Sequence, residues 1–549
     1  MVPVTAERKR SVPDISSSEP KRLHAQGSSK KLGKRKYKAK SVEPTSPSGV
    51  LQYEIKEMLK SHEISESEIF NDMRSVLNDG SMQEKYHRIV KNVTVLRLSS
   101  NGDGLAIIPH PIDDSGKQIC IIPFGLPGDV VDIKVFKTHP LYVESDLLGI
   151  TKESDLRDDK LINCKYFGKC SGCQFQNVDY DRQLILKRST IMHAYEIFAP
   201  RLSSKEGSLP EISNTEPSPL EYGYRTKLTP HFNLPYKKPE EYPRPPLGFG
   251  AKGRPKWRKE AHGGDFSILD IEDCPIGTDI INKGMKQERD IFEKDYMKYK
   301  KGATILLRED SKVVDKKPDN NSENGSVVTY QNLDDSRILM KTCVTKSRQI
   351  VTEYVNGYTF TFSAGEFFQN NNSILPVVIS YVKSKLDIDN SPDMIKNEPL
   401  YLVDAYCGSG LFSITCSEKV SSVIGVEVSA DSVQFAQRNA RENNIHNAKF
   451  IVGKAEKIFA NIDSPPLRTS VILDPPRKGC DEVFLRQLAE YNPARIVYVS
   501  CNVHSQARDI DWFINCTENG SKYIVESIKG FDFFPQTHHV ESVAVLALK

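Results

Sequence analysis

The sequence lacks the features of membrane and secreted proteins. It contains no run of about 18 consecutive apolar residues, and no secretory signal stands at its start. Its 11 cysteines are too few among 549 residues for a disulfide scaffold, so a reducing compartment leaves the thiols free for catalysis or for a metal. We therefore expect an intracellular protein without a membrane segment. The nucleus and the cytoplasm are the expected places, and the mitochondrion is a further alternative.

The chain also lacks a general basic character. Its formal net charge is +3, but residues 1–40 hold 12 of the 75 Lys and Arg residues and only 3 of the 72 Asp and Glu residues. The rest is therefore net acidic, and the basic excess belongs to the start of the chain. Low hydrophobicity with this charge predicts a disordered basic tail over residues 1–50. Such a tail is a nuclear address, a tether for nucleic acid, or a solvated segment without a role.

Apolar periodicity divides the remaining chain into four parts. Residues 51–85 show the spacing of a helical extension that packs against the body. Short β-type runs over residues 86–150 predict an OB-like barrel, and segment 122–131 resembles the TRAM module of RNA-modifying enzymes. Residues 151–365 predict a central α+β domain. From 366 to 549 strands alternate with helices, which predicts a Rossmann-like α/β domain with a mainly parallel sheet and an antiparallel pair at one edge.

Two insertions interrupt the central part. Residues 233–264 interleave basic side chains with aromatic rings, which suits RNA phosphates and unstacked bases, although a solvated loop fits equally well. Residues 310–326 are polar and predict a surface loop without chemistry.

In residues 366–549, a thiol and a carboxylate lie at the ends of predicted strands. The apolar run in residues 495–502 leads directly to Cys501, and Glu541 precedes the final strand pattern. The carboxyl ends of strands in an open α/β sheet face the ligand crevice. The two side chains are therefore candidates for a nucleophile and a base at one site. A buried strand cysteine without chemistry is the alternative for Cys501.

A cofactor loop follows the first strand pattern of this part. Residues 404–410 read D-A-Y-C-G-S-G, and Glu427 ends the next strand, where a carboxylate can bind ribose hydroxyls. The third glycine of the dinucleotide fingerprint is missing. The loop instead resembles the S-adenosylmethionine loop of Rossmann-like methyltransferases. Asp474, at the end of the fourth strand, opens a D-P-P-R segment similar to the substrate-side motif of base methyltransferases.

Four cysteines of the central part form a candidate metal site. They are spaced C-x5-C-x2-C with one later member, namely Cys164, Cys170, Cys173 and Cys274. Zinc and an iron–sulfur cluster both prefer thiolates, so the residue types leave the metal open. Structural cysteines without a metal are the alternative.

The motifs together resemble the RNA uracil-5-methyltransferases, closest to the fungal-like tRNA (uracil-5-)-methyltransferases of eukaryotes with a TRAM domain. The resemblance covers residues 86–549. Eight motifs carry it in the family's order: CKYFGKCSGCQFQ, YGYRT, FSAGEFFQNN, DAYCGSG, GVEVS, DPPRKG, VSCN and HHVESVAVL. It implies a class I S-adenosylmethionine-dependent enzyme that methylates carbon 5 of uridine 54 in the T-loop of tRNA, giving ribothymidine.

The resemblance also implies roles for individual residues. Cys501 falls on the position of the nucleophile and Glu541 on that of the proton acceptor. The positions that bind S-adenosylmethionine correspond to Gln369, Tyr406, Glu427 and Asp474. Family members with four such cysteines hold a 4Fe-4S cluster. Its implied ligands are Cys164, Cys170, Cys173 and Cys274.

The expected partner is tRNA, and we expect a monomer without an obligate protein partner. Three rival functions remain at this point. They are the same chemistry on ribosomal RNA, cytosine-5 methylation, which also uses a thiol, and a non-catalytic RNA-binding protein or RNA chaperone built on the barrel and the tail.

Overall fold

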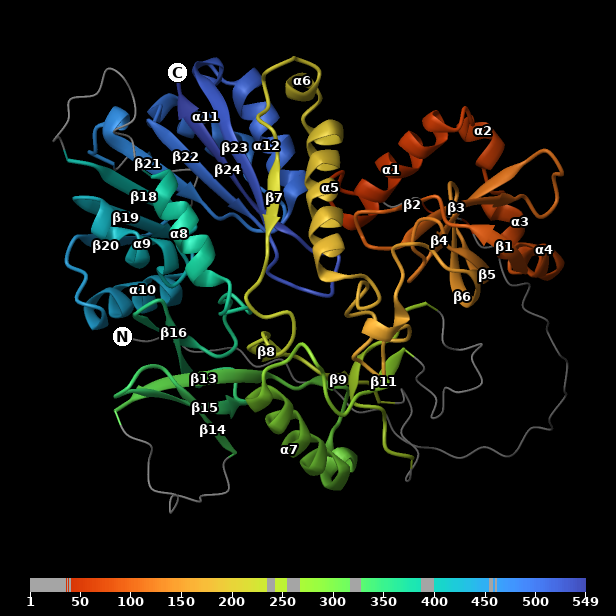
Figure 1. The fold of residues 1–549 in the computed structure, drawn as a ribbon, viewed down its shortest axis with the longest axis horizontal. Coiled ribbons are helices and arrows are strands. Elements are labelled where there is room, and N and C mark those ends of the chain that lie inside the picture. The colour runs from red at the N-terminus through yellow and green to blue at the C-terminus, as the bar shows by residue number, and fades with distance from the viewer. Residues whose placement is uncertain are drawn as a thin grey trace, which may run out of the picture.

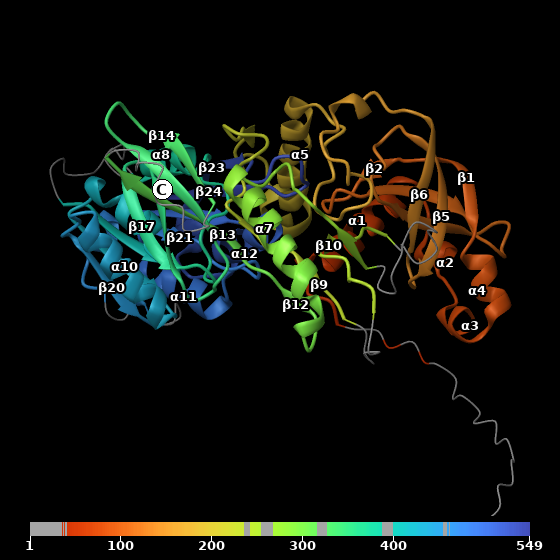
Figure 2. The ribbon, with the colours of Figure 1, turned by 90° about the horizontal axis from the view of Figure 1, so that it is seen from below.

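The computed structural model describes residues 36, 38, 41–234, 242–253, 267–315, 327–386, 399–453, 458–459 and 462–549. In Figure 1 a barrel lies on the right, an α/β domain on the left, and smaller sheets lie below them. Figure 2 shows the barrel and the α/β domain at opposite ends of the molecule. Most of the basic tail and most of insertion 233–264 lie outside the described residues. Among the described residues, no helix is long and apolar enough to cross a membrane.

Where the structure describes the chain before the barrel, it forms four helices: α1 (Pro47–Ser61), α2 (Glu66–Ile69), α3 (Met73–Asn78) and α4 (Gly80–Tyr86). Helix α1 begins at the Ser46 cap, whose hydroxyl accepts a hydrogen bond from Gly49 N at 3.2 Å. Its apolar residues recur every three or four positions and are therefore on one side of the helix. That side packs against Leu105, Ile119 and Ile121 of the barrel.

The barrel is a six-stranded sheet in the order β1-β5-β6-β4-β3-β2. Only the pairing of β4 with β6 is parallel among these strands. In β5, Val131, Ile133 and Val135 alternate into the core, as a period of two requires. The strands are β1 (Ile89–Thr94), β2 (Arg97–Leu98), β3 (Gly104–Pro109), β4 (Lys117–Ile122), β5 (Val130–Thr138) and β6 (Val143–Lys152).

The described residues of the central part form three small sheets. Their orders are β11-β10-β9-β12, β14-β15-β13-β8 and β16-β17. Helix α7 (Asp279–Asp295) packs against the first two sheets, whereas β16 and β17 pack in the core that lies on one face of the C-terminal sheet. The strands are β8 (Lys227–Leu228), β9 (His231–Phe232), β10 (Gly248–Gly250), β11 (Ile268–Asp270), β12 (Ala303–Thr304), β13 (Leu307–Val314), β14 (Val328–Asn332), β15 (Ile338–Val344), β16 (Ile350–Val355) and β17 (Tyr358–Ser363).

One prediction for this part is wrong. Residues 310–314, expected in a surface loop, continue strand β13 and pair with β15. Asp310 and Ser311 misled the prediction because these polar side chains are buried with partners. Residues 316–326 of the predicted loop lie outside the described residues. Asp310, for example, accepts a hydrogen bond from Thr352 N at 2.7 Å.

The C-terminal domain is built on an eight-stranded sheet in the order β20-β19-β18-β21-β22-β24-β23-β7. The first five strands are parallel, and β24 runs antiparallel to both β22 and β23. The strands are β18 (Tyr401–Ala405), β19 (Ser422–Glu427), β20 (Ala448–Val452), β21 (Thr469–Leu473), β22 (Arg495–Ser500), β23 (Tyr523–Phe531) and β24 (Glu541–Leu548).

Helices cover both faces of this sheet (Figure 1). On one face pack α5 (Tyr180–Phe198), α6 (Pro200–Ser203), α11 (Glu482–Tyr491) and α12 (Val503–Cys516). On the other face pack α8 (Leu375–Lys385), α9 (Leu411–Thr415) and α10 (Ala430–Glu442). Helix α5 comes from the range that we expected to belong to the central domain.

The edge of the sheet differs from the expectation. The antiparallel pair β23 and β24 is present, but β7 (Ser213–Glu216) pairs with β23 and forms the outer edge. An unpaired edge leaves backbone groups without partners, and the short strand β7 covers the end of β23 at Lys529 and Phe531.

Candidate active site

Three predicted site residues follow or begin neighbouring strands. Asp474 comes after β21, Cys501 comes after β22, and Glu541 is the first residue of β24. Strands β21 and β22 are parallel, and Ser500 of β22 pairs with Ser542 of β24. The carboxyl end of β22 therefore meets the amino end of β24. The fold brings Asp474, Cys501 and Glu541 to one edge, as the sequence predicted.

Burial controls the protonation of these groups. Glu541 is 4% exposed, and burial together with Asp474 raises its pKa to about 8. Burial and the neighbouring Asp404 raise the pKa of Asp474 to about 7. Burial, followed by Glu541 and Asp474, raises the pKa of the Cys501 thiol to about 12, and Arg477 opposes this effect. The free site therefore holds a protonated thiol beside a carboxyl group that titrates near neutral pH.

The loop after β18 opens onto free space. Tyr406 has a positive φ of 65°, and Gly408 and Gly410 have φ values of 54° and 93°. A Cβ added at Gly408 would meet no atom within 4 Å. A ligand can therefore approach the backbone closely at this point.

Two carboxylates frame this loop. Glu427 accepts hydrogen bonds from Gly408 N at 3.3 Å and from Ser429 N at 2.9 Å. Asp404 accepts two hydrogen bonds from Ser413 through Oδ2, whereas its buried Oδ1 has no partner among the described residues. The unsatisfied oxygen and the open loop fit a polar ligand such as S-adenosylmethionine.

Gln369 lies on a separate segment between β17 and α8. It is 8% exposed. Two residues later, Asn371 donates a hydrogen bond to Phe533 O at 3.0 Å, which ties this segment to the loop between β23 and β24. Gln369 therefore lies on a segment that contacts the loop leading to Glu541.

Residues of the central part of the chain make buried polar contacts with that loop, residues 532–540, and hold it in place. Lys187 donates to Asp532 Oδ1 at 2.5 Å, and both side chains are fully buried. Tyr224 donates to Pro535 O at 3.0 Å, and Gln183 donates to Gln536 Oε1 at 3.0 Å. These anchors of the Glu541 loop were missed by sequence reasoning, because nothing in the sequence pairs residues more than 300 positions apart.

Two histidines lie in the same loop. His539 Nε2 is 3.9 Å from Glu541 Oε1. Burial lowers the pKa of His538 to about 4 and that of His539 to about 3. Both rings are therefore neutral at physiological pH and add no positive charge beside Glu541.

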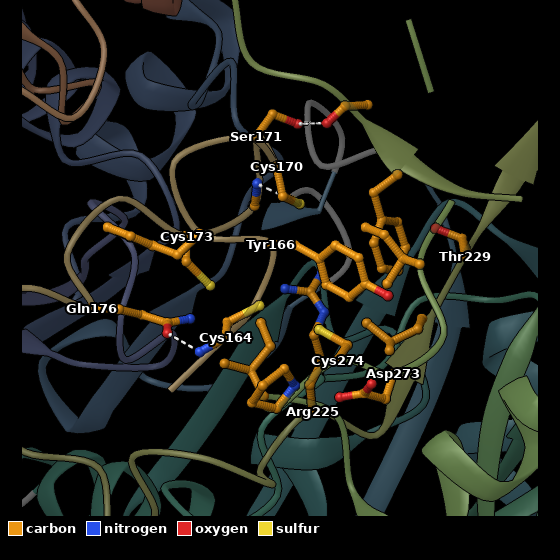
Figure 3. Close-up of a pocket in the computed structure, with 18 of the residues that line it drawn as sticks. Cys164, Tyr166, Cys170, Ser171, Cys173, Gln176, Arg225, Thr229, Asp273 and Cys274 are labelled. Atoms are coloured by element: carbon orange, nitrogen blue, oxygen red, sulfur yellow. Dashed lines mark hydrogen bonds between the residues drawn. The ribbon is translucent and has the colours of Figure 1, made fainter. Parts of the chain in front are cut away.

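The four predicted cysteine ligands line one cavity of about 340 Å³ (Figure 3). Burial is the main reason why the pKa values of all four thiols are raised. Neighbouring cysteines raise the pKa values of Cys170, Cys173 and Cys274 further. No three of these described sulfur atoms lie within 4.8 Å of one another. Thiolates suit zinc and an iron–sulfur cluster alike, so the lining of this cavity does not choose between the two metals.

The cysteine loop also contacts the middle of insertion 233–264. Ser171 donates to Gly250 O at 2.9 Å, and Lys252 N donates to Lys169 O at 2.8 Å. The described basic residues of the insertion pair with carboxylates: Arg244 with Asp270 at 2.9 Å, for example.

Comparisons with known proteins agree with this geometry. The family model for tRNA (Uracil-5-)-methyltransferase matches residues 336–549, and the TRAM domain model matches residues 84–148. The chain is 56% identical to the tRNA (uracil(54)-C(5))-methyltransferase of Saccharomyces cerevisiae, over 100% of this chain and 88% of that protein. It is 41% identical to the protein of the same name in Schizosaccharomyces pombe, over 98% and 89% of the two chains.

A solved structure shows the same fold. It is the Pyrococcus abyssi tRNA (uracil-54, C5)-methyltransferase in complex with S-adenosyl-L-homocysteine, with a TM-score of 0.54 and 22% identity. The match covers 83% of this chain and 100% of that chain. The predicted fold class, a Rossmann-like α/β domain with an OB-like TRAM barrel, is confirmed. The chain belongs to the tRNA (uracil-5-)-methyltransferase family.

Proposed function

We propose that the protein methylates carbon 5 of uracil 54 in tRNA, with S-adenosylmethionine as the methyl donor. The observation that carries the proposal is the meeting of the Cys501 thiol and the buried Glu541 carboxyl group at adjacent strand ends. The names of the two yeast relatives support the choice of tRNA and of position 54.

Carbon 5 of uracil is a weak nucleophile, and Cys501 overcomes this weakness. The thiol loses its proton to solvent water, the thiolate sulfur attacks carbon 6, and the electron pair of the 5,6 double bond moves into an enolate that makes carbon 5 nucleophilic. S-adenosylmethionine supplies the methyl group that carbon 5 takes. The thiol must ionise for the attack, and the adjacent Arg477 favours the thiolate form.

Glu541 completes the reaction. Its carboxylate accepts the proton of carbon 5, the electron pair restores the double bond, and the thiolate of Cys501 leaves carbon 6. A pKa of about 8 suits a group that takes up and releases a proton near neutral pH. The target base must leave its stack to reach this edge.

The methyl donor would lie along the loop after β18. Glu427 would accept hydrogen bonds from ribose hydroxyls, and the open backbone at Gly408 allows close approach. The positions that we propose for binding are Gln369, Tyr406, Glu427 and Asp474. Isothermal titration with S-adenosylmethionine and S-adenosylhomocysteine tests this part separately from RNA.

The decisive experiment incubates purified protein with S-adenosylmethionine and unmodified tRNA, followed by nucleoside analysis. The proposal is supported if ribothymidine forms in this tRNA but does not form in a tRNA whose uridine 54 is replaced by cytidine. Methylation of ribosomal RNA alone, or 5-methylcytidine as the product, would replace it with one of the rivals. RNA binding without any methylation would indicate an RNA chaperone.

We also propose that the four cysteines hold a 4Fe-4S cluster. The gathering of the four thiols on one cavity supports a metal site, and the resemblance of the cysteine motif to that of family members with a cluster supports iron and sulfur as its occupant. Iron and acid-labile sulfide assays after anaerobic purification measure occupancy directly. Iron-free protein that is fully folded and active would make the cysteines structural.

For tRNA recognition, we propose that the barrel binds RNA and that the protein acts as a monomer. Light scattering measures the mass of the free protein and of its tRNA complex.

We propose the nucleus or the cytoplasm as the location of the protein, with the mitochondrion as the alternative. Fluorescence microscopy of the tagged chain distinguishes these compartments.

A further inference from the structure

The short segment before helix α1 contacts the loop that carries Cys501. Residues 43–46 lie outside both family-model matches, which begin at residues 84 and 336. Thr45 is nevertheless 2% exposed. Its carbonyl accepts a hydrogen bond from Asn502 Nδ2 at 3.0 Å, and its hydroxyl lies 3.2 Å from the Ser505 hydroxyl. The segment is therefore packed at the start of helix α12, next to the proposed nucleophile.

Asn502 is the centre of this contact. Its amide nitrogen lies within hydrogen-bond distance of Thr45 O at 3.0 Å, Arg477 O at 2.8 Å and Ser505 Oγ at 2.8 Å. Its Oδ1 accepts a hydrogen bond from His504 N at 3.2 Å and caps helix α12. One side chain thus joins the amino-terminal segment, the loop after β21 and the loop after β22.

A second side chain makes a parallel connection. Arg508 donates to Glu43 at 3.1 Å and to the Thr45 hydroxyl at 3.3 Å, and it also donates to Lys478 O at 2.7 Å. The loop after β21, which begins with Asp474, is therefore held against the same segment twice. Both loops that carry proposed catalytic or cofactor groups share this support.

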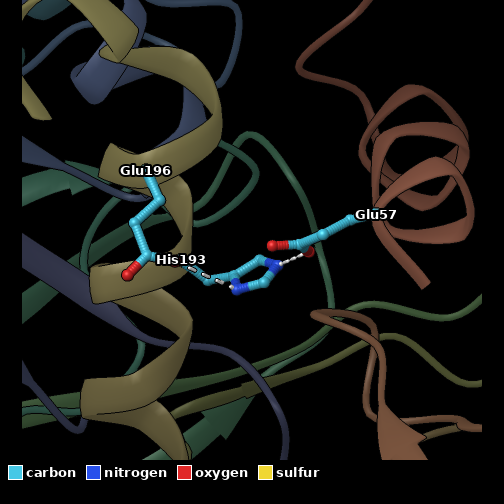
Figure 4. Close-up of side chains that lie close together, drawn as sticks. All are labelled: Glu57, His193 and Glu196. Atoms are coloured by element: carbon cyan, nitrogen blue, oxygen red, sulfur yellow. Dashed lines mark ion pairs between the residues drawn. The ribbon is translucent and has the colours of Figure 1, made fainter. Parts of the chain in front are cut away.

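Helix α1 connects the segment to the barrel and to α5. Glu54 accepts hydrogen bonds from Ser100 N at 2.7 Å and from its hydroxyl at 2.6 Å. Glu57 contacts both Arg97 of the barrel, at 3.2 Å, and His193 of α5 (Figure 4). Arg97 and the residues drawn in Figure 4 therefore form one polar network between α1, the barrel and α5.

From these contacts we propose that residues 43–46 position the active site: they hold Asn502, and through it the backbone on either side of Cys501 and at Arg477. Ordinary helix packing needs only the apolar side chains of α1, most of which lie on the barrel, whereas Val50 packs in the core of the α/β domain. It does not require a buried Thr45 that contacts three polar groups of the catalytic domain. The inference rests on the proposed function, since it assigns Cys501 as the nucleophile.

Two substitutions in the full-length protein test the role of the segment. Thr45→Val keeps the shape but removes the hydroxyl that faces Ser505 and Arg508, and Thr45→Ser restores a hydroxyl. We expect Thr45→Val to lower kcat about fivefold, the effect of one lost hydrogen bond, with unchanged KM values. Thr45→Ser should stay within about twofold of the wild-type kcat.

Asn502→Asp tests the centre of the contact. Aspartate keeps the helix cap, because its side-chain oxygen, like that of asparagine, accepts a hydrogen bond from His504 N. Its carboxylate cannot donate to Thr45 O or Arg477 O. We expect kcat to fall about tenfold or more with little change in the thermal unfolding temperature. Asn101→Ala is the matched control, because it removes a hydrogen bond from the barrel to Pro47 O, the residue that directly follows the segment and begins α1. It should leave kcat unchanged.

A wild-type kcat in both Thr45→Val and Asn502→Asp would overturn the proposal. A loss of kcat in Asn101→Ala equal to that in Thr45→Val would overturn it as well, since general loosening would then explain both. Alkylation of Cys501 by iodoacetamide, followed on its peptide by mass spectrometry, needs no RNA. We expect a rate about threefold higher or more in Thr45→Val, from local opening, and equal rates would refute positioning. Wild-type protein that cannot methylate RNA would instead refute the proposed function.

Discussion

Replacing Glu541 by glutamine should separate two steps of the reaction. Glutamine has nearly the shape of glutamate but cannot take the proton of carbon 5. Loss of a positioned base lowers a rate by about 10² to 10⁴. The attack by Cys501 should not suffer, because Glu541 is one of the groups that raise the pKa of that thiol. The Glu541→Gln protein should therefore form the covalent RNA adduct, transfer the methyl group, and then release product very slowly.

The same substitution should change how stability depends on pH. The folded protein holds the Glu541 proton up to a pKa of about 8, whereas the ordinary value is 4.5. Between these values the unfolded chain loses the proton first, so this group costs the wild-type protein stability as pH rises from 4.5 to 8. The limit is about 5 kcal/mol, at about 1.4 kcal/mol for each pKa unit. Glutamine does not titrate. The free energy of unfolding of the Glu541→Gln protein should therefore increase relative to that of the wild type over this pH range, and the difference should stay constant above it.

Gel electrophoresis under denaturing conditions measures the adduct, and single-turnover methylation with radiolabelled donor measures both steps. Thermal unfolding at pH 5, 6, 7 and 8 measures the second effect. Turnover within tenfold of the wild type, or a variant that binds tRNA and forms no adduct, would refute the assignment of Glu541 as the proton acceptor. A stability difference independent of pH would refute the raised pKa.

Three further predictions concern other parts of the site. Cys501→Ala should abolish both adduct and methylation while binding of S-adenosylmethionine by calorimetry persists; residual turnover above background would exclude the covalent route. Glu427→Ala should weaken S-adenosylmethionine binding about 10- to 100-fold, the effect of a lost charge-assisted hydrogen bond, and leave tRNA affinity in a filter-binding assay unchanged. Lys187→Met leaves the Asp532 carboxylate buried without its partner, so stability should fall by about 3 to 5 kcal/mol in urea unfolding. The double variant Lys187→Met/Asp532→Leu should recover most of this loss, and a single variant as stable as the wild type would show that the ion pair contributes nothing.

The strand-end residues were predictable because their signal is local. An apolar β-branched run followed by Cys501 or Asp474 predicts a buried parallel strand, and such strands place their carboxyl ends on one edge. The acidic end of β19 and the glycine loop after β18 were found in the same way. Polar side chains inside β13 carried no such signal, because their partners lie on other strands.

The sequence by itself therefore determined the fold class, the family, the order of the domains along the chain and the residues at the strand ends, because each of these depends on neighbours in the chain or on motifs. Only the tertiary structure decided which distant segments support those residues. It joined Lys187 to Asp532 across 345 positions and Thr45 to Asn502 across 457 positions. Such contacts have no periodicity in the sequence: they arise when packing removes polar groups from water and each buried donor must find an acceptor.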